Sequence, residues 1–354
     1  MLWKYPTRHT SSRSPIAGCS LNGHSFPRPR AIAKSKQKFE TNQNANARMS
    51  IEYYASNNMM NASTMPTLTE SEIDQFWHDG VLTASDAVDA NLLERLKRDF
   101  NTWVDESRTE TEPYGTCIDR RPRFDLQPGH TAGRPALRRV QAPTEVSEAY
   151  YEAMANSRMT DMVADLIGSN VKLHHTKINS KLPGTTTEVK WHQDFCFTPH
   201  TNTDVLTALL MIDDVTEENG PLEVQPGSHK GPLHSIWHDG VFTGAVDADI
   251  EAEISRNSVR CIGSAGSVCL MHTRLAHGSA PNRSQKPRTL LICVYSAGDA
   301  HACTPNPVPT NHEGLFVRGE DPHRIRTEEY AIETPLFPKT SFFAQQSVDE
   351  RDTT

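Results

Sequence analysis

Residues 206–212 read LTALLMI and residues 290–296 read LLICVYS, and these two apolar runs decide the class of fold. Each has the length of a β-strand and falls far short of the roughly 18 apolar residues that are needed to cross a bilayer. Many short strands between turn residues predict a β-sandwich or β-barrel. Similar short runs, separated by Gly, Pro, Asn and Asp, recur after residue 168, at 171–178, 188–192, 222–225 and 267–272.

Helical patterns come before the strand region. Thr69 and Glu72 have the spacing of a capping box, and Gly80 is placed to end the helix that follows. An apolar face over residues 92–104 predicts a second, longer helix. Helices first and strands afterwards indicate a mostly β fold with helices packed on one side. Further helical patterns are at 145–156 and 159–167.

The beginning of the chain differs from the rest in charge. The 354 residues include 36 Lys+Arg and 44 Asp+Glu, but residues 1–39 hold eight of the basic residues and no acidic one, which leaves a net charge of −16 on the remainder. Residues 1–65 are rich in Ser, Asn, Pro and Met, so we expect a disordered or targeting extension. Residues 1–48 could be a transit peptide to mitochondria or another organelle. The alternatives are a solvated tail, or an upstream extension of a chain that starts at Met49.

Composition also excludes some classes of partner. The acidic body disfavours nucleic acid, which binds proteins through Lys and Arg. The seven cysteines are odd in number, scattered and without a CxxC pair, which favours reduced thiols over disulfides or a zinc–thiolate site. We therefore expect a soluble intracellular protein, in the cytoplasm unless residues 1–48 direct it elsewhere, with a small-molecule partner, no nucleic acid and no membrane. The oligomeric state stays open.

Two separated segments carry the side chains of a metal site. In the sequence WHQD of residues 191–194, His192 and Asp194 leave the same face of an extended chain and can converge on one ion. Such a pair alone is weak evidence, but His277 adds a second imidazole, and two histidines with one carboxylate match the set that holds Fe(II). A zinc hydrolase would use similar ligands and would leave Arg288, at the start of an apolar strand, unexplained. A buried guanidinium there needs an anionic partner.

These segments resemble the signature of the phytanoyl-CoA dioxygenase (PhyH) family of Fe(II)- and 2-oxoglutarate-dependent oxygenases. The resemblance covers roughly residues 68–300 and implies a double-stranded β-helix, a cupin-like jelly-roll barrel with flanking helices. We expect one dioxygenase domain over 66–345, with N-terminal helices 66–168, a jelly-roll core 169–300 and a C-terminal extension 301–345. The matching blocks are His192-x-Asp194, Asn219-Gly220-Pro221-Leu222, Pro226-Gly227-Ser228-His229 and His277-Gly278-Ser279-x-x-Asn282-x-Ser284-x-x-x-Arg288.

The resemblance also implies roles for single residues. It places Arg288 and Ser279 on the distal carboxylate of 2-oxoglutarate, and it implies hydroxylation of an aliphatic carbon with O2 as oxidant and release of succinate and CO2. Halogenating relatives carry Ala or Gly where this chain has Asp194, so halogenation is disfavoured. Desaturation, ring modification and a non-catalytic metal-binding barrel are the alternatives. The implied iron ligands are His192, Asp194 and His277.

Other polar residues near the motifs have two interpretations each. Asn179, thirteen residues before His192, falls where related hydroxylases place an amide on 2-oxoglutarate, or else it satisfies backbone at a strand edge. His272 lies five residues before His277 and so faces the other way along a strand, which favours His277 as the ligand. His174 and His175 either line the cavity or form a core or surface pair.

The substrate is predicted only in outline. Some arginines of a cluster just before the barrel could recognise a carboxylate, phosphate or CoA group, while the alternative is solvation or pairing with Asp and Glu. The cluster consists of Arg120, Arg121, Arg123, Arg134, Arg138 and Arg139. Arg138 and Arg139 are the preferred candidates because Leu137 and Val140 bracket them. An apolar pocket could be lined by Phe195, Phe197, Trp237 and Phe242, although core packing is the alternative for them.

Overall fold

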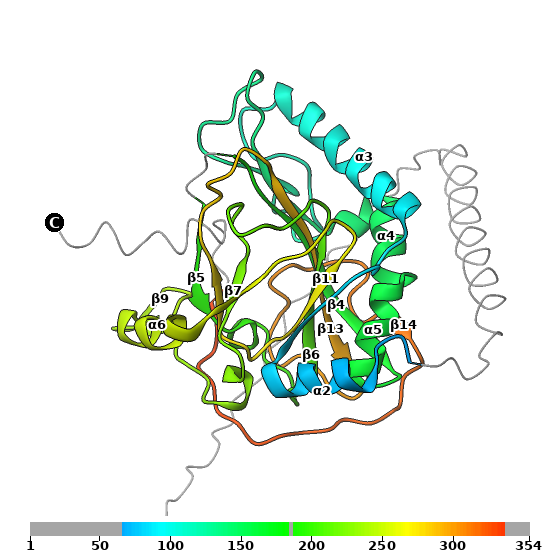
Figure 1. Cartoon of the computed structure of the whole chain (residues 1–354), viewed down its shortest axis with the longest axis vertical. Helices are drawn as coiled ribbons and strands as arrows, with labels where there is room; N and C mark the ends of the chain where they lie inside the picture. Colours follow the sequence, from blue (N-terminus) through cyan, green and yellow to red (C-terminus); the bar gives the residue numbers. More distant parts are fainter. Residues whose placement is uncertain (1–65, 184–186, 337–354) are drawn as a thin grey trace, which may run out of the picture. The chain divides into compact units, whose positions relative to one another are not determined.

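Two antiparallel β-sheets lie at the centre of the computed structural model, which describes residues 66–183 and 187–336 (Figure 1). The predictions for residues 1–65 and 337–345 lie outside the described residues. In sheet order, the larger sheet contains β1 (Val81–Ala84), β11 (Val268–His272), β6 (Val205–Met211), β13 (Arg288–Ala297), β4 (Val171–Lys181), β3 (Leu137–Gln141) and β2 (Phe124–Leu126), with β14 (Phe316–Arg318) also beside β4. The smaller sheet contains β10 (Val259–Cys261), β7 (Leu222–Val224), β12 (His277–Ser279) and β5 (Val189–His192).

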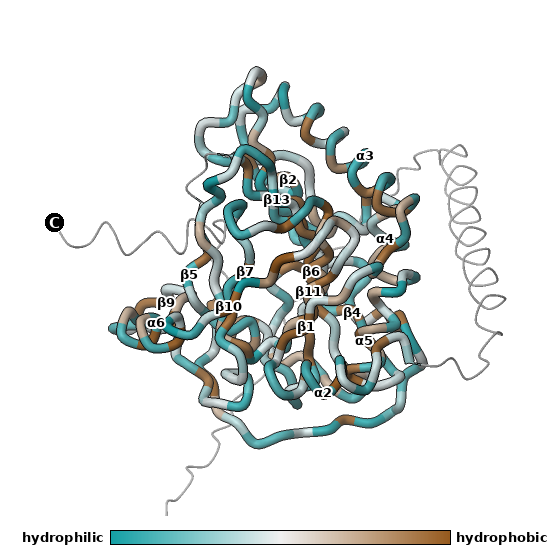
Figure 2. The backbone as a smooth tube through the Cα atoms, in the orientation of Figure 1, coloured by the Kyte–Doolittle hydropathy of each residue, from teal (hydrophilic) through white to brown (hydrophobic). Residues whose placement is uncertain are grey.

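Alternation along the long strands separates the hydrophobic core from the space between the sheets. On β6, Leu206, Ala208 and Leu210 belong to the core cluster that includes the helices, whereas Leu209 and Met211 pack toward the smaller sheet. This is the period of two that an extended chain imposes. Figure 2 shows hydrophobic residues concentrated along the central strands, where β6 and β11 lie. The predicted mostly β architecture with flanking helices is confirmed.

The helices α3, α4 and α5 cover one face of the larger sheet, whereas α6 packs beside Trp191 of the smaller sheet. Figure 1 shows α3, α4 and α5 along one side of this sheet, with β5 and β7 on the other side. The buried Tyr295 of β13 ties the layers together, because its hydroxyl donates a hydrogen bond of 2.7 Å to the carbonyl of Met154 in α4. The helices of the described residues are α2 (Glu70–Asp79), α3 (Ala90–Glu106), α4 (Glu148–Ala155), α5 (Arg158–Ile167) and α6 (Ala248–Ile254). None of them combines the length and apolar character that crossing a membrane requires.

The capping box predicted for the first helix is present. The Thr69 hydroxyl accepts a hydrogen bond from the backbone N–H of Glu72, and the Glu72 carboxylate accepts one of 2.8 Å from the N–H of Thr69. Gly80 ends α2 with φ 81°, and a Cβ there would collide with the ring of His229. A glycine is therefore required where α2 turns into β1.

The segment before the core contains strands that the sequence patterns did not indicate. β1 pairs with β11, and the β2–β3 pair extends the larger sheet beyond β4. These strands are short, and β3 carries the charged pair Arg138 and Arg139, so strand propensity alone is weak there. Pairing with the edge of β4 supplies the missing backbone hydrogen bonds.

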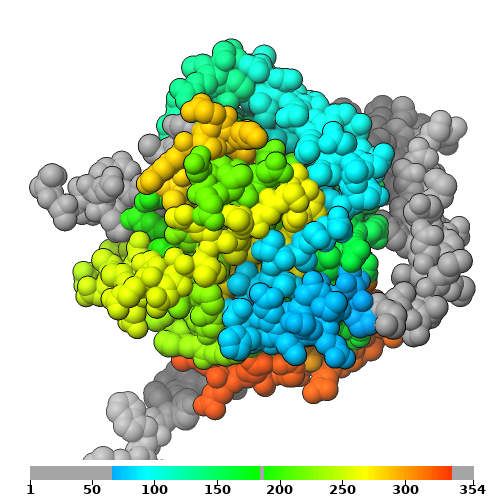
Figure 3. Space-filling view, viewed as in Figure 1, coloured from blue at the N-terminus to red at the C-terminus, as the bar shows by residue number. Residues whose placement is uncertain are grey.

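The chain after β13 packs back on the core. Figure 3 shows the C-terminal part of the described chain along the lower edge of the molecule, beside the region of α2. Arg326 forms ion pairs with Asp204, Asp299 and Glu328, and the Tyr330 ring packs edge-on against Phe195 with centroids 5.1 Å apart. The segment is therefore anchored to the sheet by charged and aromatic contacts.

Candidate active site

The three predicted metal ligands meet at one end of the smaller sheet. His192 is the last residue of β5, Asp194 begins the short helical turn that follows, and His277 is the first residue of β12. Because β5 and β12 are antiparallel neighbours with His192 opposite His277, the two imidazoles lie side by side. Their Nε2 atoms are 3.4 Å and 3.7 Å from Asp194 Oδ1. One ligand atom from each residue lies within 4.8 Å of the others.

Backbone carbonyls orient both imidazoles for metal binding. Nδ1 of His192 lies 2.8 Å from the carbonyl of Lys190, and Nδ1 of His277 lies 2.9 Å from that of Leu275. A carbonyl only accepts, so each Nδ1 donates its proton to the carbonyl, and each Nε2 faces the centre of the group. Burial, with a contribution from His192, lowers the pKa of His277 to about 4, so this ring is neutral at neutral pH.

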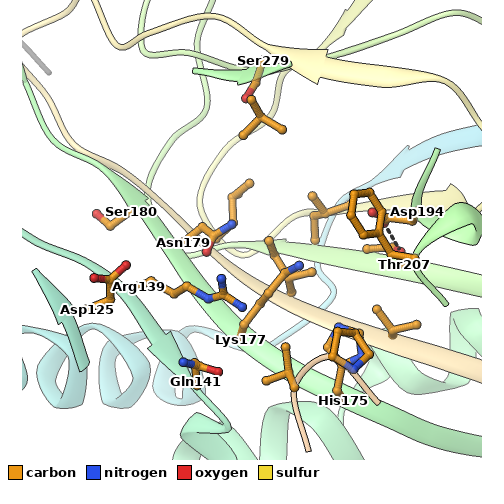
Figure 4. Close-up of a pocket in the computed structure, with 18 of the residues that line it drawn as sticks. Asp125, Arg139, Gln141, His175, Lys177, Asn179, Ser180, Asp194, Thr207 and Ser279 are labelled. Atoms are coloured by element: carbon orange, nitrogen blue, oxygen red, sulfur yellow. Dashed lines mark hydrogen bonds between the residues drawn. The ribbon is translucent and has the colours of Figure 1, made fainter. Parts of the chain in front are cut away.

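The carboxylate of the group is held in its ionised form. Burial raises the pKa of Asp194, but the neighbouring His277 and His192 outweigh it and the net shift is downward. The Thr207 hydroxyl donates a hydrogen bond of 2.8 Å to Oδ2, which leaves Oδ1 facing the histidines (Figure 4). Two imidazoles that turn Nε2 toward one point, together with an ionised carboxylate, therefore fit a divalent metal such as Fe(II).

A cavity of about 280 Å³ between the two sheets adjoins this group (Figure 4). His192, Asp194 and His277, called the metal-ligand group below, form part of its wall. Apolar side chains of the larger sheet, including Leu209, Leu290 and Ile292, form another part. Four basic side chains of the larger sheet also line it, and they are Arg139, Lys177, Lys181 and Arg288.

Arg288 lies inside the fold, as its place at the start of an apolar strand predicted. It is 4% exposed, and its Nε donates a hydrogen bond of 3.1 Å to the carbonyl of Gly220. Gly220 has φ 78°, and a Cβ there would come within 2.6 Å of the Ala280 carbonyl, which explains the glycine in the predicted Asn-Gly-Pro-Leu block. Burial lowers the pKa of Arg288 to about 10, so the guanidinium stays charged. It has no ion pair within residues 66–183 and 187–336.

Lys181 is a site residue that sequence reasoning missed. It ends β4 directly opposite Arg288, and its Nζ donates hydrogen bonds of 2.7 Å and 3.1 Å to the hydroxyl and the carbonyl of Ser279. Burial, helped by the charge of Arg288, lowers the pKa of Lys181 to about 6. The strand was predicted to end at residue 178, so Lys181 was placed beyond it. Continuing the alternation from Asn179 would have found it.

The structure separates the two arginines proposed for substrate binding. Arg138 forms an ion pair with Asp125, with Nε 2.9 Å from Oδ2, and it is not among the residues that line the cavity. Arg139 faces the cavity instead and lies opposite Asn179 in the β3–β4 ladder. The Arg139 Nε and the Asn179 Oδ1 are buried without a hydrogen-bond partner in the described part of the chain. Of the other arginines, Arg123 pairs with Glu145.

Three histidines that the sequence also offered near the motifs, His174, His175 and His272, lie outside the group of His192, Asp194 and His277. His272 contacts the rings of Trp77 and His229 instead, with centroids 6.1 Å and 5.2 Å away. His174 and His175 are buried and share a hydrogen bond of 2.7 Å between their Nδ1 atoms, and of these two only His175 lines the cavity.

The four aromatic residues proposed for a pocket have different roles. Phe197 lines the cavity and packs edge-on against His192 with centroids 5.5 Å apart. Phe195 is fully buried in a small core cluster with Val205 and Val294. Trp237 and Phe242 pair across the hairpin of β8 (Trp237–His238) and β9 (Val241–Phe242). Only Phe197 of the four therefore borders the cavity.

Comparison with known proteins identifies the family and agrees with this fold. A sequence model described as "Phytanoyl-CoA dioxygenase (PhyH)" matches residues 76–290. A probable alpha-ketoglutarate-dependent hypophosphite dioxygenase of Stutzerimonas stutzeri is 33% identical over 236 residues, which cover 65% of this chain and 82% of that protein. L-proline trans-4-hydroxylase of Streptomyces griseoviridis is 27% identical over 242 residues, which cover 59% of this chain and 88% of that protein.

A solved structure confirms the fold. The crystal structure of EctD from S. alaskensis with 2-oxoglutarate and 5-hydroxyectoine superposes with a TM-score of 0.55 at 22% identity, over 75% of this chain and 89% of that chain. The predicted jelly-roll barrel with flanking helices is therefore confirmed. The family match over residues 76–290, together with the 33% identity, shows that the chain belongs to the phytanoyl-CoA dioxygenase family of Fe(II)- and 2-oxoglutarate-dependent oxygenases.

Proposed function

We propose that this enzyme hydroxylates an aliphatic carbon of a small anionic molecule. One observation carries the proposal: two histidine Nε2 atoms and a carboxylate oxygen converge beside a cavity that also contains the buried Arg288 guanidinium. A set of two histidines and one carboxylate binds Fe(II) and leaves positions open for a cosubstrate and O2. The proposed iron ligands are His192, Asp194 and His277.

Arg288 is the proposed partner of the distal carboxylate of 2-oxoglutarate. Its planar fork suits a carboxylate through two parallel hydrogen bonds. The Ser279 hydroxyl accepts its hydrogen bond from Lys181, so its own proton is available to the same carboxylate. Asn179 faces the cavity and is proposed to donate an amide N–H to the cosubstrate.

The protein's part in the reaction is to bind, orient and exclude water. When bound, iron and 2-oxoglutarate supply the oxidising chemistry: O2 and 2-oxoglutarate are consumed, one oxygen atom enters succinate, CO2 is released and the other oxygen atom enters the substrate C–H bond. The carbonyls of Lys190 and Leu275 keep the two imidazoles in one tautomer, and Thr207 holds the carboxylate. The apolar wall of Leu290 and Ile292 limits access of water.

A small substrate is supported by the size of the cavity and by the relatives. Ligand cavities usually measure about 300–1,000 Å³, and this one, of about 280 Å³, has to hold 2-oxoglutarate as well. The relatives are named for hypophosphite and L-proline, and the EctD crystal contains 5-hydroxyectoine, which are all small molecules. Their differing chemistry points to a shared reaction with different substrates.

We further propose that residues 66–345 act as one catalytic domain, with helices over 66–168, the jelly-roll core over 169–300 and a C-terminal extension over 301–345. The support is that strands from before and after the core pair with it. β1 pairs with β11, whereas β3 and β14 both pair with β4.

The test is anaerobic addition of Fe(II) and then 2-oxoglutarate, followed by O2 and a substrate panel. We expect the weak visible absorption that arises when 2-oxoglutarate chelates Fe(II). After O2 is added, succinate and a hydroxylated product should form together. Asp194→Asn is the matched variant, because it removes one charge and keeps the shape of the side chain. Iron-loaded wild-type protein that gives no absorption with 2-oxoglutarate would refute the proposal.

A further inference from the structure

Arg139 and Lys177 bring two cationic side chains to one part of the cavity wall. In the β3–β4 ladder Arg139 lies opposite Asn179 and Gln141 lies opposite Lys177, so Arg139 and Lys177 are diagonal neighbours on the same face. Figure 4 shows both side chains reaching into the same space, with Asn179 beside them and Asp194 across the cavity. Their charged ends can therefore address one ligand.

The protein supplies no counter-ion for this pair. Within the described ranges neither side chain forms an ion pair, and the Arg139 Nε is buried without any hydrogen-bond partner. The nearby carboxylates are engaged, because Asp125 pairs with Arg138 and Asp194 belongs to the metal-ligand group. Burial lowers the pKa of Arg139 to about 10 and that of Lys177 to about 8, so both are mainly charged at neutral pH.

The cosubstrate does not account for these charges. Lys177 and Lys181 are four residues apart on β4, so their Cα atoms are about 13 Å apart along the strand. The metal and the Arg288–Lys181 end of the cavity already match the two carboxylates of 2-oxoglutarate. Two uncompensated cations in a largely buried site are costly unless an anion joins them. A second anion is therefore expected at Arg139 and Lys177.

We propose that Arg139 and Lys177 bind the anionic group of the substrate, which is a compact oxyanion. This inference rests on the proposed function and assigns the substrate class: a small carboxylate, phosphonate or phosphinate with an oxidisable aliphatic C–H bond. The Arg139 fork suits two oxygens of one group, and Lys177 adds a point charge. The cavity of about 280 Å³ limits the rest of the substrate to a few atoms once 2-oxoglutarate is bound.

The experiment measures binding of oxyanions to the anaerobic complex of the full chain with Fe(II) and 2-oxoglutarate. The probes are butyrate, methylphosphonate and hypophosphite, with butyramide as the neutral counterpart of butyrate, and the readout is the change in visible absorption. At least one anion is expected to perturb the wild-type spectrum and to increase succinate formation, whereas butyramide does neither. The three anions distinguish carboxylate from phosphorus oxyanions as the natural group.

Arg139→Gln and Lys177→Gln are the test variants. Arg134→Gln is the control, because it removes the same single positive charge from an exposed residue. Each test variant should weaken anion binding by at least about tenfold, which is the usual effect of losing a charge-assisted hydrogen bond. The half-saturating 2-oxoglutarate concentration should change by less than about threefold. An unaltered 2-oxoglutarate absorption in each variant shows that the site is folded, so a lost anion response is then specific.

Four results would overturn the inference, three of them as follows. The first is butyramide binding as well as butyrate, and the second is anion binding that is unchanged in both test variants. The third is a half-saturating 2-oxoglutarate concentration that rises about tenfold in the variants, which would assign the pair to the cosubstrate. A wild-type protein that shows the 2-oxoglutarate absorption but responds to none of the anions also counts against this inference alone. Absence of that absorption in iron-loaded wild type counts against the proposed function instead.

Discussion

The smaller sheet contributes short strands to the cavity, and the larger sheet contributes long ones. β5 and β12 have four and three residues, whereas β4 and β13 have eleven and ten. Short strands end at the cavity, so their terminal residues His192 and His277 converge on one point. Long strands run along the cavity, so alternate residues such as Lys177 and Lys181 line it at intervals. The smaller sheet therefore presents one metal-ligand group, and the larger sheet presents separated basic side chains.

This difference predicts two independent sets of effects. Variants of the residues at the end of the smaller sheet should mainly change iron binding, because these side chains form the metal-ligand group. Variants of the cations on the larger sheet should change anion binding while iron binding stays intact. A variant that altered both by similar factors would show that the two regions are coupled.

The largest effect is expected from Asp194→Asn. The amide keeps the shape of the carboxylate and removes the charge that the two histidines and the metal share, so iron affinity should fall by more than about 100-fold, beyond the loss typical of residues that only support a ligand. Succinate formation should fall with it. Iron content after anaerobic equilibration, measured at several Fe(II) concentrations, gives the affinity. Full iron loading of the variant at wild-type concentrations would contradict the assigned ligand.

Arg288→Ala should have the next largest effect, and on a different quantity. Removing the fork from a buried site should raise the half-saturating 2-oxoglutarate concentration by about 100-fold, since charge-assisted hydrogen bonds there are strong and water replaces them poorly. Iron affinity should stay within a few-fold of wild type. Arg288→Lys serves as the control, because it keeps the charge and loses the fork. Equal 2-oxoglutarate dependence in Arg288→Ala and wild type would contradict this role.

The metal-ligand group could be predicted from the sequence because its information is local. His192 and Asp194 are two residues apart, and His277 begins a block with its own glycine and serine. Arg288 could be predicted because it starts an apolar strand, where a charged side chain is out of place. The capping box at Thr69 was equally local, since it depends on four consecutive residues.

The cations of the larger sheet could not be predicted in the same way. A lysine in a strand normally indicates the solvent face, so Lys177 carried no signal, although it is partly buried and lines the cavity. The sequence could not choose between Arg138 and Arg139, because the choice depends on which face of β3 meets the cavity. The pairing of β3 with β4 decides which alternate residues of β3 face the cavity, and no local sequence pattern reveals it. The short strands β1, β2 and β3 were missed for the same reason.

Thr207→Val tests how far the larger sheet supports the metal-ligand group. The valine keeps the volume and removes the hydroxyl that donates to Asp194 Oδ2, so the carboxylate loses a positioning hydrogen bond. Residues that orient a metal ligand typically change affinity by about 10–100-fold, and we expect the low end because Asp194 also faces two histidines. Iron titration of Thr207→Val and of Thr207→Ser measures the effect. The serine variant should behave as wild type, and a weakened serine variant would assign the effect to packing.

Lys181→Met should have the smallest effect, and its signature is pH dependence. Burial and Arg288 lower the pKa of Lys181 from 10.5 to about 6 in the folded protein. The unfolded chain therefore binds more protons between pH 6 and pH 10.5, and this lysine makes stability rise with pH across that window. The methionine variant lacks this contribution. The thermal midpoint of the methionine variant should exceed that of wild type by the largest amount near pH 6, and this difference should shrink toward pH 10.

Binding of 2-oxoglutarate tests the same lysine, because it should raise the pKa of Lys181 that burial lowers. A carboxylate placed beside Arg288 raises the pKa of Lys181, so at pH 7.5 the wild-type protein should take up as much as one proton for each 2-oxoglutarate bound. Calorimetric titration in two buffers with different ionisation enthalpies measures this uptake. Lys181→Met should take up none, and the exposed-lysine control Lys286→Met should match wild type. Equal uptake in all three proteins would mean that the carboxylate is held by Arg288 without Lys181, and that the two cations at this end of the cavity act separately.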